Sequence, residues 1–178
     1  MQYISTYDSP IGNILLAADE LGLTGLWLEG QRYFAHCLNS EYAEEEISVF
    51  VKAKEWLDNY FLGAEPSFKL PLHFMGTDFQ NEVWEILCSI PYGATATYGE
   101  IAKQLASKRG IRQMSAQAVG GAVGRNEISI IVPCHRVIGA NGSLTGYAGG
   151  IDKKIALLNL ERIDTTKLFV PKKCRTRP

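Results

Sequence analysis

The hydrophobic pattern of this chain changes type near residue 76, and the change limits the folds that the chain can adopt. Before this point, short apolar runs alternate with turn residues at 8–12 and 19–22, which is typical of an antiparallel meander of strands. After it, apolar side chains recur at helical spacing. We therefore predict an α/β domain over residues 1–75 with a small antiparallel sheet, and a mostly helical domain over 76–178, with the boundary at 75–77.

Strands and one helix are expected in the first domain. The predicted strands are residues 3–7, 13–18, 23–28 and 68–72. A helix is predicted after the third strand, because a set of apolar residues recurs close to one face at a spacing of 3.6 residues. These residues are Ile47, Phe50, Val51, Leu57 and Phe61.

The second domain is expected to be built mainly from helices. The predicted helices are residues 79–90, 98–105, 116–124 and 152–162, with Thr77 or Asp78 capping the first and Ser115 the third. The second and third follow one another in a basic region, as in a helix-turn-helix, although their link is longer than usual. Strand and turn are expected at 137–149, with Asn141-Gly142 as a hairpin signal. The fold class is therefore α/β plus α, with a winged-helix-like second domain.

Charge is divided unevenly along the chain, although the net charge is only −1. Residues 1–75 carry four Lys/Arg and eleven Asp/Glu, a net of −7, whereas 76–178 carry fourteen and eight, a net of +6. The end of the chain, 167–178, holds five basic residues and no acid. An acidic half joined to a basic half suggests that the basic half faces a polyanion. A basic tail alone is weak evidence, because such tails are common.

Composition excludes several protein classes. The hydrophobic share of 46% is typical of a globular protein. No apolar run approaches the length of a membrane span, and the first residues do not resemble a signal peptide. The four cysteines, at 37, 88, 134 and 174, have neither CxxC spacing nor the density of a disulfide scaffold. A reducing cytoplasm is the expected compartment.

Two stretches bear on chemistry, and each has an ordinary interpretation as well. Residues 133–137 place the Cys134 thiol beside an imidazole and a guanidinium, which favour the reactive thiolate; a cysteine after an apolar run is more often a small buried hydrophobic residue. Residues 117–124 hold three glycines within five positions, although each costs about 1 kcal/mol in a helix. They form either a mobile loop or a helix whose backbone closely approaches a partner such as a DNA groove.

A set of short motifs in the second half belongs to a recognisable pattern. The matching segments are 76–80, 83–84, 90–93, 97–102, 118–122, 126, 131–139, 146–150 and 157–161. The Pro-Cys-His-Arg-Val core, with the Gly-Tyr and Leu-Leu…Glu elements that follow it, is the most specific part. On these residues the chain resembles the O6-alkylguanine-DNA alkyltransferases, also called methylated-DNA–protein-cysteine methyltransferases. The first 70 residues match only in general character.

The resemblance implies a DNA-repair enzyme that acts once. Cys134 would be nucleophile and methyl acceptor, His135 the general base acting through a water, and Glu161 the carboxylate that orients His135. The methyl or alkyl group would come from O6-methylguanine, and less well from O4-methylthymine, in double-stranded DNA. Because a thioether is not hydrolysed, each molecule would repair one lesion and be consumed. No cofactor and no membrane partner are implied, and a monomer is expected.

Further roles follow from the same resemblance. Asn126 would be a hinge between the recognition helix and the active-site loop, or simply a helix C-cap. Tyr147 would donate a hydrogen bond to the modified base. Tyr98 would crowd the target phosphate and promote base flipping, which costs a few kcal/mol, unless its ring merely packs inward. Arg136 is expected to support the loop. The other predicted DNA-binding residues are Gln117, Ala118, Gly120 and Gly121.

The chain departs from the family pattern at two places. Gln117 stands where the family has an intercalating arginine, so we expect weaker flipping or DNA binding, with the chemistry retained. The link 107–115 is longer than usual, and its Lys108, Arg109 and Arg112 are candidates for compensating phosphate contacts. A zinc site is also not expected, because the Cys and His residues of the first domain do not reproduce the set found in some animal members.

Three alternatives remain open at this point. An alkyltransferase-like protein would bind lesions without reacting, but such proteins replace the cysteine that this chain retains. A Cys-His hydrolase would regenerate its thiol, and the glycine-rich helix would have no purpose in it. A helix-turn-helix regulator would not require the Cys-His-Glu set.

Overall fold

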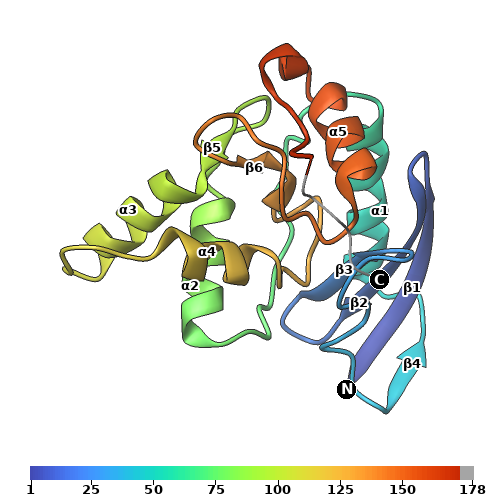
Figure 1. Ribbon diagram of the computed structural model, residues 1–178. Coiled ribbons are helices and arrows are strands. Elements are labelled where there is room, and N and C mark those ends of the chain that lie inside the picture. The colour runs from blue at the N-terminus through green and yellow to red at the C-terminus, as the bar shows by residue number, and fades with distance from the viewer. Residues whose placement is uncertain (173–178) are drawn as a thin grey trace.

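The first half of the chain folds into a four-stranded sheet covered by one helix. The structure is a computed structural model that describes residues 1–172, so 173–178, the end of the predicted basic tail, lie outside it (Figure 1). The strands are β1 (Gln2–Ser9), β2 (Gly12–Ala18), β3 (Leu23–Leu28) and β4 (Tyr42–Glu44), in the order β3-β2-β1-β4. The first three form the predicted antiparallel meander, whereas β4 pairs with β1 in parallel.

Helix α1 (Ser48–Phe61) turns a slightly different face to the sheet from the one predicted. Phe50 and Leu57 are buried as expected, but Val51 is 56% exposed. Its place in the core is taken by Ala53 and by Tyr60, which is fully buried. The predicted face did not include Tyr60, because a tyrosine enters a core only where its hydroxyl finds a partner.

The predicted strand at 68–72 is wrong. This segment makes a single bridge, between Leu72 and Leu23 of β3, with Leu23 N–H donating to the Pro71 carbonyl at 2.9 Å. Pro71 has no N–H to continue a ladder, so the pairing stops after one bridge.

The second half is mostly helical, as predicted. Its helices are α2 (Asp78–Leu87), α3 (Tyr98–Lys108), α4 (Ala116–Val123) and α5 (Ile151–Leu160). Thr77 and Ser115 cap α2 and α4 as predicted. Helices α2, α3 and α4 contact one another, and α3 and α4 follow one another as the helix-turn-helix pattern requires. Within residues 1–172, no helix has the length and apolar character needed to cross a membrane.

Residues 137–149 form the expected turn but not the expected hairpin. Strand β6 (Val137–Ile138) pairs in parallel with β5 (Ala96–Thr97) and not with the chain that follows it. The Asn141-Gly142 turn is present: Gly139 N–H donates to the Ser143 carbonyl at 2.9 Å, and Gly142 has a φ of +83°. A further short segment, the 3₁₀ turn Cys134–Arg136, precedes β6.

The two halves share one hydrophobic core and a hydrogen-bonded junction. The loop after α4 lies along the edge of β3, where Leu26 exchanges backbone hydrogen bonds with Glu127 (2.8 Å) and Ser129 (2.9 Å). The Trp27 indole N–H donates to the buried Glu127 carboxylate at 2.7 Å. Figure 1 shows the sheet on one side of the molecule and α2–α4 on the other. The loop at this junction leads directly to Cys134.

Candidate active site

Cys134 lies at the start of the 3₁₀ turn and is buried, with 5% of its surface exposed. Its Sγ is 3.0 Å from the side-chain nitrogen of Asn126. Burial raises the pKa of the thiol, and the Asn126 amide and the Lys154 ammonium oppose this rise only in part. The resting thiol is therefore protonated, and its ionisation requires a base.

The sequence-based expectation about nearby cations needs correction. Arg136 does not act on the Cys134 thiol, because its guanidinium is engaged elsewhere. The cation that lowers the thiol pKa is Lys154 of α5, which is 1% exposed and donates to the Val137 and Thr145 carbonyls at 2.5 and 3.1 Å. No sequence signal identified Lys154, because a lysine on a helix usually faces solvent.

His135 is fully buried, and its two ring nitrogens have different surroundings. Nε2 lies 2.6 Å from Glu161 Oε1, which assigns the proton to Nε2. Nδ1 has no hydrogen-bond partner among the described residues. Burial lowers the pKa of His135 despite the adjacent carboxylate. The imidazole is therefore neutral at rest, with Nδ1 free to accept a proton.

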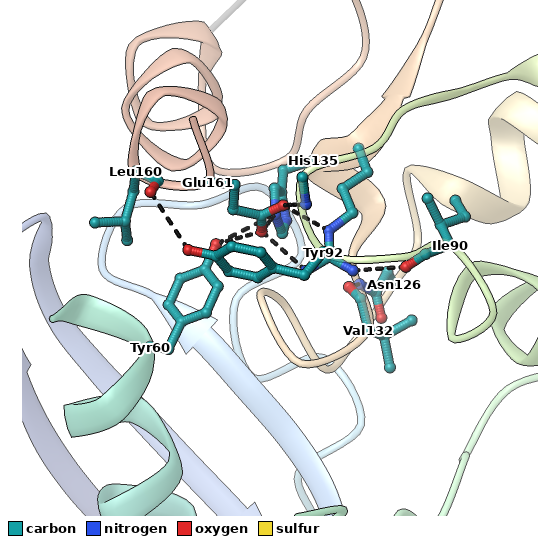
Figure 2. A network of polar contacts seen from close by, with 10 residues as sticks. Tyr60, Ile90, Tyr92, Asn126, Val132, His135, Leu160 and Glu161 are labelled. Atoms are coloured by element: carbon teal, nitrogen blue, oxygen red, sulfur yellow. Dashed lines mark hydrogen bonds and ion pairs between the residues drawn. The ribbon is translucent and has the colours of Figure 1, made fainter. Parts of the chain in front are cut away.

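Glu161 is the acceptor on which the site converges (Figure 2). It follows the last residue of α5 and accepts from His135, from Arg136 Nε and Nη2 at 2.8 and 3.0 Å, and from the Gly93 N–H at 3.2 Å. Burial would raise the pKa of this carboxyl, but the His135 and Arg136 bonds lower it to about 2. Arg136 also donates to the Ile90 carbonyl at 2.6 Å, so it supports the loop as predicted.

A further donor to Glu161 comes from the first half of the chain and was missed by the sequence analysis. The Tyr60 hydroxyl, from α1, donates to Glu161 Oε1 at 2.7 Å and lies 3.3 Å from His135 Nε2 (Figure 2). Burial and the Glu161 charge raise the pKa of Tyr60 far above its ordinary value, so the hydroxyl stays protonated. One signal was available: Tyr60 lies three positions after Leu57, on the same helix face.

Asn126 connects the end of α4 to the cysteine loop. Its side-chain nitrogen lies 2.9 Å from the Val132 carbonyl as well as 3.0 Å from Sγ, and its Oδ1 accepts from the Ile128 N–H at 3.0 Å. The C-cap of α4 is Gly124, so the alternative that Asn126 is merely a cap is wrong.

Tyr147 presents a second buried polar atom without a partner. Its hydroxyl makes no hydrogen bond to the described residues. The Ser129 hydroxyl lies near enough to influence it, but donates to Gln31 Oε1 at 3.2 Å instead. Burial, and then the neighbouring Cys134, raise the pKa of Tyr147 well above its ordinary value. The group is a protonated phenol available to a ligand.

Helix α4 exposes a nearly bare backbone. Gln117, Ala118 and Gly121 are exposed, and a Cβ added at Gly121 would meet no atom within 4 Å. Among residues 1–172, no neighbouring atom therefore leaves too little room for a side chain at this position. Gly120 is half-buried, and a Cβ added to it would lie 3.6 Å from the Tyr98 ring. Tyr98 is half-buried too, and its hydroxyl donates to the Thr145 carbonyl at 3.1 Å, so its ring packs inward in this state.

The basic link between α3 and α4 is only partly free for other contacts. Lys108 pairs with Glu85 at 2.7 Å and Arg109 with Glu82 at 2.9 Å, both on α2. These exposed pairs are weak, so they are open to exchange with other anions. In residues 1–172, no three His, Cys, Asp or Glu side chains gather as metal ligands would.

Comparison with known proteins covers both halves of the chain. Residues 2–74 match the model of the 6-O-methylguanine DNA methyltransferase ribonuclease-like domain, and 78–163 match that of its DNA-binding domain. A methylated-DNA–protein-cysteine methyltransferase of Methanosarcina acetivorans is 48% identical over 89% of this chain and 97% of its own length. One of Mycobacterium tuberculosis is 46% identical over 91% and 93%.

Solved structures agree with the sequence relatives. The crystal structure of the Mycobacterium tuberculosis O6-methylguanine methyltransferase has a TM-score of 0.76 at 46% identity, covering 91% of this chain and 93% of that one. The same organism's OGT in complex with DNA has a TM-score of 0.77 at 43% identity, covering 94% and 99%. On this evidence, the chain belongs to the 6-O-methylguanine DNA methyltransferase family.

Proposed function

We propose that this protein repairs double-stranded DNA by transferring the methyl or alkyl group of O6-methylguanine, and less well of O4-methylthymine, irreversibly to Cys134. It acts as a monomer and once. The observation that carries the proposal concerns unpaired polar atoms. Among the described residues, the only buried side-chain nitrogen or oxygen atoms without a hydrogen-bond partner are His135 Nδ1 and the Tyr147 hydroxyl. Such atoms are costly to leave unpaired, which points to a water and a substrate as their partners.

The thiol proton leaves through His135. Nδ1 accepts it by way of a water, while Nε2–H keeps its bond to Glu161. The carboxylate, held ionised by its five donors, stabilises the imidazolium that forms. The Asn126 side-chain N–H and the Lys154 charge favour the thiolate as it develops.

The thiolate then attacks the methyl carbon in line with the carbon–oxygen bond. A carbon–sulfur bond forms and the carbon–oxygen bond breaks, so that the electron pair departs with O6 into the guanine ring. The Tyr147 hydroxyl donates a hydrogen bond to the departing base. The proton taken from sulfur ends on guanine, so methylated guanine and thiol become guanine and thioether with no co-reactant.

DNA is held by the exposed face of α4. Ala118, Gly120 and Gly121 let the helix backbone approach the groove, and Gln117 fills the space left by the extruded nucleotide. Tyr98 gives up its inward hydrogen bond to the Thr145 carbonyl to bear on the phosphate of that nucleotide. The open space around Gly121 supports this assignment, because no contact among the described residues accounts for the glycine and close approach of a partner would.

The test is to mix the protein with a duplex that carries one O6-methylguanine and to measure intact and peptide masses. A gain of one methylene on the Cys134 peptide, absent in Cys134→Ala, is the expected result. An unmodified protein that still binds the lesion would support the non-reacting, alkyltransferase-like alternative. Regeneration of the free thiol would support a hydrolase.

A further inference from the structure

Two arginines from different halves of the chain meet on one tyrosine ring beside the glycine-rich helix. The Arg125 guanidinium lies 4.0 Å from the centre of the Tyr33 ring, and that of Arg32 lies 4.8 Å from it. Arg125 follows α4, whereas Arg32 and Tyr33 belong to the loop after β3. We propose that these three residues bind a DNA backbone phosphate next to the extruded nucleotide, so that the N-terminal domain takes part in DNA binding.

The loop that carries Arg32 is held in place, so its charge has a defined position. Gln31 accepts the Leu28 N–H at 2.8 Å through its buried side chain. The Arg32 N–H donates to the Ala148 carbonyl at 3.0 Å, which ties the loop to the segment containing Tyr147. Tyr33 itself has a φ of +61°, a left-handed conformation that is rare for a residue with a side chain.

The two guanidinium groups have no carboxylate of their own. Both side chains are exposed, and neither forms an ion pair with an acid in residues 1–172. The charge of Arg125 acts to lower the pKa of Glu127. The Glu127 carboxylate, however, accepts the Trp27 indole N–H and lies 3.5 Å from His36 Nδ1. Two guanidinium groups over one ring repel each other unless an anion lies between them or beside both. Arginine is the side chain best suited to bind phosphate.

The position of the cluster identifies the anion. A cavity of about 410 Å³ lies between the cluster, the bare side of α4 and the segment around Tyr147. Its lining includes Arg32, Tyr33, Arg125, Gly121, Gly124 and Tyr147. The cavity therefore connects the face proposed to enter the DNA groove with the residue proposed to bind the base. A polyanion that follows this path places a phosphate against the arginines.

The site also bears on the missing arginine of α4. With Gln117 the helix brings no charge into the DNA stack, and Arg32 and Arg125 supply positive charge at the backbone instead. The inference rests on the proposed function, so its test separates phosphate binding from methyl transfer.

The experiment compares wild type, Arg32→Ala and Arg125→Ala on two substrates: a duplex with one O6-methylguanine, and the O6-methylguanine nucleoside, which has no phosphate. Lys52→Ala is the matched control, because it removes an exposed positive charge from α1. Affinity for the duplex is measured against salt concentration. Each arginine variant should bind the duplex about 10-fold more weakly with a log–log salt slope reduced by about 1, as for one lost phosphate contact. Transfer from the nucleoside should be unchanged.

A second duplex series locates the phosphate. Neutral methylphosphonates replace single phosphates around the lesion, and one replacement should weaken wild-type binding more than binding by Arg32→Ala, which retains only Arg125 at that phosphate. Equal losses on duplex and nucleoside would overturn the proposal, because they would mean that the arginines support the pocket. Duplex affinity and salt slope equal to those of Lys52→Ala would overturn it as well. If wild type binds the duplex but methylates neither substrate, the proposed function fails, while the binding series still decides the phosphate site.

Discussion

At the scale of single residues, the chemistry depends on how one carboxylate is satisfied. Glu161 accepts five hydrogen bonds, from Tyr60, Gly93, His135 and twice from Arg136. Its charge fixes the proton of His135 on Nε2 and leaves Nδ1 as a buried acceptor without a partner among the described residues. The fully buried side chain keeps this charge only because every donor is in place.

Glu161→Gln should remove a stabilising contribution that depends on pH. The pKa of Glu161 is about 2 in the folded protein, against 4.5 for an ordinary glutamate. A carboxyl whose pKa is lowered by folding stabilises the fold above its unfolded pKa, and this contribution is lost as the pH falls through the folded value. Wild-type stability should therefore decrease between pH 4.5 and 2 more steeply than that of the variant. Urea midpoints across this range measure the difference; parallel curves would contradict it.

The site residues that lie within the family's motifs could be predicted from sequence, and those that lie outside the motifs could not. Cys134 and His135 are neighbours in the chain, and Glu161 lies in a motif at a recognisable distance. Tyr60 is 101 residues from the glutamate that it contacts, so no local pattern relates the two. Lys154 was missed for another reason: its buried ammonium depends on two backbone carbonyls that only the folded chain brings together.

At the scale of elements, α1 is more than a cover for the sheet. It carries Tyr60 to the carboxylate at the end of α5, so a helix of the N-terminal domain positions the proposed acid–base pair. The N-terminal domain therefore contributes a side chain to the candidate site itself.

Tyr60→Phe should slow methyl transfer several-fold, because His135 and Glu161 lose a shared partner. Duplex affinity should stay unchanged, since Tyr60 is fully buried and cannot contact DNA. Loss of a hydrogen bond to a charged group should also lower the free energy of unfolding by about 1.5–3 kcal/mol. Single-turnover rates, measured with binding titrations, separate the two effects. A matched control is Tyr7→Phe, which removes a hydroxyl that donates an exposed hydrogen bond to Asp58. Equal rates for both variants would exclude a role for Tyr60.

A substitution on helix α4 should increase the affinity for duplex DNA. Gln117→Arg places a cation on its exposed first turn, so the protein should bind duplex more tightly and with a salt slope steeper by about 1. Gln117→Leu keeps a side chain of similar size without polarity and should leave the slope unchanged. Fluorescence anisotropy at several salt concentrations measures both. An unchanged slope in the arginine variant would mean that this position does not contact the backbone.

At the scale of the whole molecule, the two domains are joined through the loop that leads to the cysteine. Residues 127–129 extend the sheet at Leu26, and Trp27 reaches across to Glu127. The domain boundary predicted at 75–77 thus describes the order of elements along the chain, while the core itself is continuous.

Trp27→Phe should destabilise the whole protein by about 1–3 kcal/mol, because the buried Glu127 carboxyl loses its closest donor. Burial raises the pKa of Glu127, and the loss of the indole N–H should raise it further. The difference between variant and wild type should therefore grow as the pH rises above the glutamate range. Thermal unfolding at several pH values, followed by far-ultraviolet circular dichroism so that the signal does not depend on tryptophan, tests this. Two separate unfolding transitions, of which the substitution shifts only one, would contradict unfolding as a single cooperative unit.

Strand β3 shows what the junction means for solubility. All six of its residues are buried, although it lies at the end of the sheet order. A long apolar edge with unpaired backbone groups invites strands from other molecules to add to it. Here Ile128 and Leu72 occupy that edge through bridges to Leu26 and Leu23. The segment that leads to the reactive cysteine therefore also protects the protein from aggregation, and any event that displaces the segment exposes a surface prone to self-association.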